Sequence, residues 1–254
     1  MAKRATAQNR RRRERGSLNP EDIIDGAFEL AQRVSIDGLS MPLLGRHLNV
    51  GVTSIYWYFR KKDDLLNAMT DRALRLYVYT APYPSVEASK WRESLVNHAR
   101  ILRRTFLDNP ILCDLILIRS ALSQHAGRVG AEQLERTVAT LVDAGLSIEQ
   151  ALDTYSAINL HIRGSVVLQR LYDKNQDGEG SSRAYYDSIV VDPQTTPLLA
   201  AAAARGLRSG APDERNFEYG LGCILDHIGR LIDRNAAARA NSVAPQRRSG
   251  AADR

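Results

Sequence analysis

Apolar positions along most of this chain recur every three or four residues, the spacing that places them on one face of an α-helix. The first such stripe consists of Ile23, Ala27, Ala31 and Val34. Asn19-Pro20 is a favourable start for it, because Asn can cap a free backbone N–H and Pro lacks the N–H that a first turn leaves unpaired. The pattern predicts a helix from Asn19-Pro20 to a break at Gly38.

Two short helices are predicted next. Ser40 caps the first one, whose shared apolar face consists of Met41, Leu44 and Leu48. A tight turn at Asn49 to Gly51 separates it from a second short helix over Val52 to Phe59. The order of helix, break, short helix, turn and short helix is that of a helix-turn-helix, here at about residues 40–60, whose last helix enters the major groove of DNA.

The last short helix ends in four aromatic residues, "YWYF" (56–59), followed by "RKK". Ile55 and Phe59 lie four apart and are expected to face the core, which leaves Thr53, Ser54, Tyr56 and Trp57 on the flanks and outer face. Hydroxyl groups there can hydrogen-bond base edges. Tyr58 and Lys62 at the helix end can reach phosphate oxygens. A surface helix with spare aromatics would show the same pattern.

The remainder of the chain is also mostly helical in pattern, which predicts an all-α fold. Helices are expected at about 63–79, 86–108, 111–124, 130–143, 147–172, 197–206 and 213–234. Ser147 with Gln150 forms a capping-box pattern at the start of one of them. Only Asp187 to Val191 looks like a strand. We expect a DNA-binding domain over 18–80 and a larger helical domain over 81–234.

Charge is concentrated at the two ends of the 254-residue chain. The net charge is +6, yet residues 1–17 alone hold seven basic side chains against one acidic, and residues 235–254 hold four against one. The chain between them is net negative. We expect 1–17 to be a disordered basic arm that contacts a polyanion through residues such as Arg12 and Arg13, with a merely solvated tail as the alternative. Residues 235–254 are expected to be a disordered tail.

Several other classes of protein find no support in the sequence. No apolar run is long enough to span a bilayer. Cys113 and Cys223 are expected to be buried, reduced thiols of a cytoplasmic protein, with a disulfide between them as the alternative. The five histidines include no i, i+4 pair, and no glycine-rich phosphate loop or nucleophile elbow is present. We therefore expect no metal site, no cofactor and no enzymatic activity.

Residues 44–74, "LGRHLNVGVTSIYWYFRKKDDLLNAMTDRAL", resemble the DNA-binding domain of the tetracycline-repressor (TetR) family of bacterial regulators. That pattern has an apolar helix, a Leu-Gly-Val turn, a run of aromatic residues and a Lys followed by Leu residues. Here the turn is Leu48-Asn49-Val50 and the lysine is Lys62. The resemblance covers about residues 19–75. It implies a homodimeric transcription factor, usually a repressor, with a helical ligand-binding domain.

The resemblance also implies which residues contact DNA. Those expected to face the bases are Gly51, Val52, Thr53, Ser54 and Tyr56, and those expected to face the backbone are Ser40, Trp57, Tyr58 and Lys62. Two positions depart from the family pattern. Pro42 stands where some members carry a base-reading Arg, so that contact is absent. Asn49 replaces the turn glycine, but Asn tolerates the left-handed conformation and the turn should be kept.

The end of the chain resembles the ligand domain of the same family. "NFEYGLGCILDHIGRLID" (216–233) implies a helix that joins the 147–172 helix and their twins in a four-helix bundle. The predicted dimer interface consists of Phe217, Leu221, Ile224 and Ile228, although an intramolecular core would look the same. Polar residues that interrupt apolar stretches are the candidate ligand contacts, with core or interface groups as the alternative: His98, Arg103, Asn159, His161 and Arg163.

These expectations combine into one functional hypothesis. The protein would be a ligand-responsive regulator that binds palindromic double-stranded operator DNA as a homodimer, most simply a repressor released by a small molecule whose identity the sequence does not give. A transcriptional activator and an effector-independent DNA-binding protein of the same fold are the alternatives. No membrane partner is expected.

Overall fold

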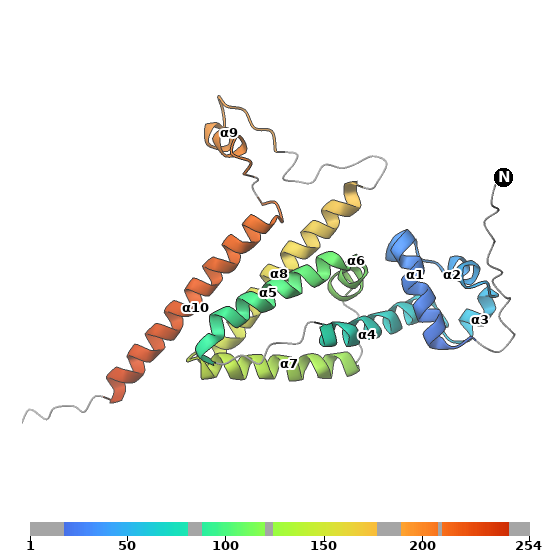
Figure 1. Ribbon diagram of the computed structural model, residues 1–254, viewed down its shortest axis with the longest axis horizontal. Coiled ribbons are helices and arrows are strands. Elements are labelled where there is room, and N and C mark those ends of the chain that lie inside the picture. The colour runs from blue at the N-terminus through green and yellow to red at the C-terminus, as the bar shows by residue number, and fades with distance from the viewer. Residues whose placement is uncertain (1–17, 81–87, 120–123, 177–188, 208–209, 244–254) are drawn as a thin grey trace, which may run out of the picture.

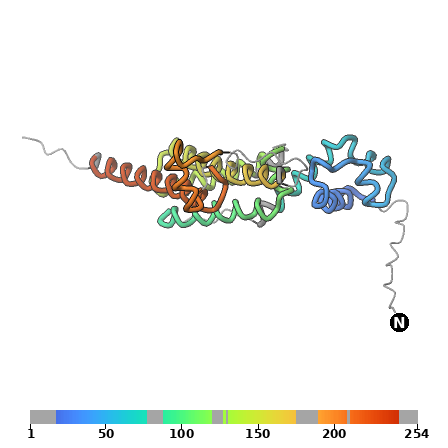
Figure 2. Tube along the Cα trace, turned by 90° about the horizontal axis from the view of Figure 1, so that it is seen from above, coloured from blue at the N-terminus to red at the C-terminus, as the bar shows by residue number. Residues whose placement is uncertain are grey.

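A computed structural model describes residues 18–80, 88–119, 124–176, 189–207 and 210–243. Within these ranges every regular element is a helix, which confirms the predicted all-α fold. A small N-terminal group of helices lies at one end of the molecule, and a larger C-terminal group makes up the rest (Figure 1). The view from above shows the same elongated arrangement (Figure 2).

The N-terminal group begins with α1 (Pro20–Gly38), and its predicted cap is present. The side chain of Asn19 accepts a hydrogen bond from the N–H of Asp22 at 2.9 Å, and the carboxylate of Asp22 accepts one from the N–H of Asn19 at 3.4 Å. The next two helices are α2 (Met41–Leu48) and α3 (Val52–Tyr56). They enclose a core whose fully buried members include Ile23, Leu44 and Ile55.

The linking helix expected at about 63–79 is α4 (Lys62–Thr80). Leu65, Met69 and Ala73 on one face of it are 0% exposed. α4 belongs to the N-terminal group at its start and reaches the C-terminal group at its end (Figure 1). It is therefore a continuous connection between the two groups.

Four long helices build the C-terminal group: α5 (Trp91–Asp108), α7 (Gln124–Asp143), α8 (Ile148–Gln176) and α10 (Glu214–Val243). α8 contacts each of the other three. The capping box at its start is confirmed, because Ser147 and Gln150 exchange side chain–backbone hydrogen bonds of 3.0 and 3.2 Å. The short elements are η1 (Ala88–Lys90), α6 (Pro110–Leu112), the π-helical turn η2 (Cys113–Ile118) and α9 (Pro197–Ala203).

Several predicted boundaries were wrong. The helix expected at 111–124 is instead α6 continued by η2, and α7 begins at Gln124 rather than at about 130. α8 continues to Gln176. Residues 189–191, the described part of the expected strand, form no regular element, because a single short apolar run has no strand to pair with.

The tail expected to be disordered from residue 235 onward is helical as far as Val243, as the end of α10; residues 244–254 and the basic arm lie outside the described residues. The segment "NAAARA" lacks an apolar stripe, but Ala and Arg are strong helix formers, and extending an existing helix needs no new nucleus. Asn235 also stabilises this part of α10, because its side chain donates a hydrogen bond to the carbonyl of Gly145 at 2.9 Å.

Both cysteines are free thiols. Cys113 is buried as expected, and burial raises the pKa of its thiol to about 11. Cys223 is exposed in the single chain, which corrects the expectation for that residue. Along the described residues, no helix has the length and apolar character required to traverse a lipid bilayer.

Candidate functional site

A tight turn joins α2 to α3. Asn49 adopts the left-handed conformation with φ 55° and ψ 44°, as expected for a residue in place of a turn glycine. The N–H of Val50 donates to the carbonyl of Gly45 at 2.9 Å. A Cβ added to Gly45 would lie 3.2 Å from the carbonyl oxygen of Val50, so a side chain there would push α2 and the turn apart. The sequence alone did not single out this glycine.

α3 is shorter than the expected helix over 52–59. It ends at Tyr56, and the N–H groups of Tyr58 and Phe59 both donate to the carbonyl of Ile55, which makes a turn. This turn brings Phe59 into the core at 8% exposure, next to the fully buried Ile55. Two apolar anchors therefore fix α3 from behind.

The residues expected to face bases lie mostly on the open side of α3. Gly51, Thr53 and Ser54 are exposed, Tyr56 is 44% exposed, and Val52 is half-buried. Trp57 is 85% exposed, with its ring edge-on to that of Tyr58 at 6.1 Å between centroids. Of the four consecutive aromatic residues only Phe59 belongs to the core. The other three form an outward aromatic surface that folding alone does not require.

Three of the residues expected to face phosphates have partners within the chain. The hydroxyl of Ser40 caps α2 by accepting from the N–H of Leu43 at 3.4 Å. The hydroxyl of Tyr58 donates to the carbonyl of Leu18 at 2.8 Å. A phenol has one hydrogen, so a phosphate would compete with Leu18 for it.

The side chain of Lys62 makes two hydrogen bonds within the chain that its position in the sequence did not predict. Its ammonium group donates to the carbonyls of Ile36 and Asp37, at 3.2 and 3.4 Å, at the end of α1. An ammonium group has three hydrogens, so one remains for a phosphate oxygen. The roles of Ser40, Tyr58 and Lys62 at DNA therefore remain predictions.

Positive charge near α3 comes from Arg46, Arg60 and Lys61, all of which are exposed. Arg12 and Arg13 of the predicted arm lie outside the described residues. The first described residue, Leu18, is the one that Tyr58 contacts, so the chain leaves the N-terminal group next to the end of α3.

Two of the five candidate ligand contacts are brought together in the C-terminal group. The guanidinium carbon of Arg103, in α5, lies 4.7 Å from the ring centre of Phe217. The imidazole of His161, in α8, stacks on the same ring at 5.0 Å, and its Nε2 lies 2.8 Å from the carbonyl oxygen of Phe217. Arg103 also donates to Glu214 and to the carbonyl of Pro212. Its Nε is buried without a hydrogen-bond partner.

The other three candidates do not join this cluster. Asn159 donates to the carbonyl of Tyr155 on its own helix at 2.9 Å, and Arg163 is exposed. His98 is buried at 4% exposure, and burial lowers the pKa of its imidazole to about 4. The five residues therefore do not form a single site.

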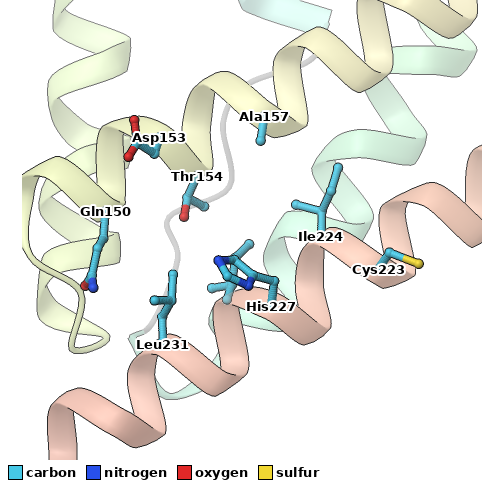
Figure 3. A pocket seen from close by; sticks show the side chains of 9 residues that line it. Gln150, Asp153, Thr154, Ala157, Cys223, Ile224, His227 and Leu231 are labelled. Carbon is cyan, nitrogen blue, oxygen red and sulfur yellow. The ribbon is translucent and has the colours of Figure 1, made fainter.

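A groove of about 510 Å³ runs between α8 and α10, and none of the five candidates lines it (Figure 3). Figure 3 shows Thr154 and Gln150 pointing from α8 toward the side chains of His227 and Leu231 on α10. The full set of lining residues is Gln150, Asp153, Thr154, Ala157, Cys223, Ile224, His227, Ile228 and Leu231. The sequence did not reveal this groove, because its two walls are separated by about 65 residues of chain.

The structure corrects most of the predicted dimer interface. Phe217, Leu221 and Ile228 are 2%, 1% and 1% exposed in the single chain, so they pack in its own core and offer little surface to a second copy, although Ile228 also lines the groove. Only Ile224 is half-buried. The stripe on α10 is buried within the same chain, where Phe217 contacts Arg103 of α5 and His161 of α8. The exposed apolar side chains on these two helices include Leu160 at 70% and Tyr219 at 76%.

A metal centre finds no support in the described ranges, where no three His, Cys, Asp or Glu side chains are grouped to hold an ion. The described residues thus form an exposed polar and aromatic surface at one end and a helical group with a polar cluster and a groove at the other.

Comparison with known proteins agrees with this arrangement. Residues 23–69 match the bacterial regulatory proteins of the tetR family, and residues 83–231 match the tetracyclin repressor-like C-terminal domain. An HTH-type transcriptional repressor of Mycobacterium tuberculosis is 63% identical over 98% of this chain and 94% of its own length. The tetracycline repressor protein class A from transposon 1721 of Escherichia coli is 31% identical over 86% of this chain and 94% of its own length.

Solved structures show the same fold. Apo ActR from Streptomyces coelicolor superposes with a TM-score of 0.62 at 25% identity, covering 87% of this chain and 99% of that one. TetR from Acinetobacter baumannii gives the same TM-score at 20% identity, covering 85% and 99%. The chain thus belongs to the TetR family of bacterial regulatory proteins.

Proposed function

We propose that this protein is a ligand-responsive transcriptional repressor that binds operator DNA as a homodimer. The observation that carries the proposal is the outer face of α3, where Thr53, Ser54 and Tyr56 are exposed while Ile55 behind them is fully buried. A short helix with polar side chains outward and a rigid apolar back suits the major groove. The relative that is 63% identical carries the name of a repressor, which supports the direction of regulation.

In the proposed complex, Thr53, Ser54 and Tyr56 hydrogen-bond base edges, and Gly51 lets the backbone come close to the bases. Trp57 and the third hydrogen of Lys62 contact the phosphate backbone. These contacts hold each half of the dimer in register. Arg12 and Arg13 would add sequence-independent attraction, which the exposed Arg46, Arg60 and Lys61 support locally.

For the dimer, we propose contact through the outer sides of α8 and α10. Leu160 and Tyr219 support this assignment, because both are large and exposed in the single chain, and a second copy could cover them. Gly222 also has open space around it, which would allow a second helix to approach closely. A two-fold dimer would read a palindromic operator.

For the effector, we propose a small molecule that contacts Arg103 and His161 within the C-terminal group. The unpartnered Nε of Arg103 supports this, because it can donate a hydrogen bond to a ligand oxygen beside the ring of Phe217. Relatives support the class of ligand only in general terms: one structure of ActR holds actinorhodin. The effector would have to bind the DNA-free state more tightly, because equal affinity for both states shifts nothing.

The proposal is tested by selecting bound fragments from random duplex DNA and then screening small molecules for release of the selected duplex. We expect a two-fold symmetric consensus and at least one compound that lowers affinity for it. By linkage, saturating operator must weaken binding of that compound by the same factor. A compound whose affinity is unchanged by operator is not the effector, and a protein that enriches no sequence is not a repressor of this kind.

A further inference from the structure

The N-terminal and C-terminal groups contact each other through residues outside the linking helix α4 as well as through α4 itself. Besides the contacts that α4 makes with η2 and α7 and the contact of α1 with α6, an ammonium group bridges the two groups directly. Lys174, near the end of α8, lies 2.9 Å from the carboxylate of Asp37 in α1 and 3.1 Å from the carboxylate of Asp114 in η2. We propose that Lys174, through Asp37, is a specificity-determining residue that fixes the half-site spacing the dimer reads.

The C-terminal side of this bridge is rigid without Lys174. Asp114 is 4% exposed, and the guanidinium group of Arg170 contacts both of its oxygens, at 3.0 and 2.8 Å. A buried carboxylate needs a partner of opposite charge, and Arg170 already supplies one. Lys174 is therefore not required to neutralise Asp114. What it alone provides is the connection to Asp37.

The N-terminal side of the bridge is a strained end of a helix. Ser35, within α1, has φ 60° and ψ 172°, which is unusual for a residue with a side chain and kinks the helix. The two residues that follow, Ile36 and Asp37, are held from inside the N-terminal group by the ammonium group of Lys62. Lys174 holds the same segment from the other group, and its proximity lowers the pKa of the Asp37 carboxyl. The kinked C-terminal end of α1 thus contacts a lysine from each group, Lys62 and Lys174.

This placement matters for DNA reading, and here the inference rests on the proposed dimeric repressor. With α8 and α10 paired across the two-fold axis, the angle between each N-terminal group and its own α8 sets the distance between the two α3 helices. α4 and the contact of α1 with α6 join the two groups, and neither of them connects the N-terminal group to α8. The Lys174–Asp37 pair adds a connection from α8 to α1 that further restricts turning of the N-terminal group, so operators with matching half-site spacing fit both α3 helices best.

The bridge is suited to orienting rather than to holding the fold together. The side chain of Asp37 is 77% exposed, and exposed ion pairs add little to stability. Lys174→Met and Asp37→Asn should therefore leave the protein folded. An exposed pair biases an equilibrium by up to about fivefold, and the dimer carries two of them, so the spacing preference should fall by roughly three- to twentyfold.

The experiment uses the full-length protein and the duplex selected by it from random DNA, remade with one or two base pairs added to or removed from the centre. We expect wild type to prefer the original spacing, and Lys174→Met, Asp37→Asn and the double variant to lose that preference to the same extent. Arg100→Met is the matched control, because it removes the 2.7 and 2.8 Å hydrogen bonds of Arg100 with Glu218 inside the C-terminal group. It should keep the wild-type preference.

The outcomes separate the two claims. If wild type selects and prefers a spacing but both bridge variants keep that preference, or if Arg100→Met loses it equally, the inference is overturned and the proposed function stands. If wild type selects no duplex at all, the proposed function fails and this inference fails with it.

Discussion

Two adjacent residues of α3 should respond in opposite ways to the same substitution. Ile55 is 0% exposed and Tyr56 is 44% exposed. Ile55→Ala removes three buried carbon atoms, which costs about 2.4 kcal/mol at about 0.8 kcal/mol each. The cavity left behind raises the cost to about 3–4 kcal/mol. Tyr56→Ala removes a side chain that solvent already reaches on one side, so its cost to stability should stay below about 1 kcal/mol.

On DNA the order should reverse. Tyr56→Ala should weaken binding to the selected operator by about 1–3 kcal/mol and binding to random duplex far less. Ile55→Ala should bind with near wild-type selectivity under conditions where it remains folded. Urea unfolding at one fixed protein concentration measures the first quantity, because the stability of a dimer depends on concentration. Titration of both duplexes measures the second.

If the free energy of unfolding of Ile55→Ala lies within about 1 kcal/mol of the wild-type value, Ile55 does not anchor α3 as described. If Tyr56→Ala weakens operator and random duplex equally, Tyr56 acts on the backbone rather than on bases.

Three further predictions follow from burial and charge. Burial lowers the pKa of His98 from 6.5 to about 4, so the unfolded chain binds more protons than the folded one between these pH values, and the free energy of unfolding should fall by about 2–3 kcal/mol from pH 7 to pH 4.5. His98→Leu should reduce this pH dependence, as measured by urea titrations. A pH dependence equal to that of wild type would contradict the prediction. Leu160→Asp should give a folded monomer in light scattering, because that side chain is 70% exposed in one chain, whereas Ile228→Asp should unfold it; a stable Leu160→Asp dimer would exclude this face. Deleting residues 1–16 should reduce the slope of log K against log salt by a few units, roughly 0.9 for each phosphate that the arm neutralises, and an unchanged slope would identify the arm as a solvated tail.

Features set by short-range hydrogen bonding could be predicted from the sequence. The cap at Asn19, the left-handed Asn49 and the box of Ser147 with Gln150 each depend on side chain–backbone contacts within a few residues. Such contacts form wherever the local sequence occurs, so reading the residues in order is sufficient.

Features that depend on the packing of one helix against another could not be predicted in the same way. The stripe at Phe217, Leu221 and Ile228 correctly indicated a buried face, but an apolar stripe does not specify whether the neighbour is the same chain or a second copy. Arg103 and His161 both contact the ring of Phe217 only because α5 and α8 pack near it.

The contact of Lys174 with Asp37 joins residues 137 apart in the chain, so no local pattern carries it. The early end of α3 has a related cause, because the turn after Tyr56 is imposed by burial of Phe59 rather than by any helix-breaking residue.

The central claim is that the outer face of α3 reads base pairs, and a paired selection tests it most directly. Wild type and Thr53→Ala are each used to select from the same pool of random duplexes, and the two consensus sequences are compared position by position. We expect wild type to give a two-fold symmetric consensus, and Thr53→Ala to relax the base preference at one symmetric pair of positions while the rest is retained. Identical consensus sequences from Thr53→Ala, Ser54→Ala and Tyr56→Ala, each matching wild type, would contradict the claim that this face of α3 reads the operator.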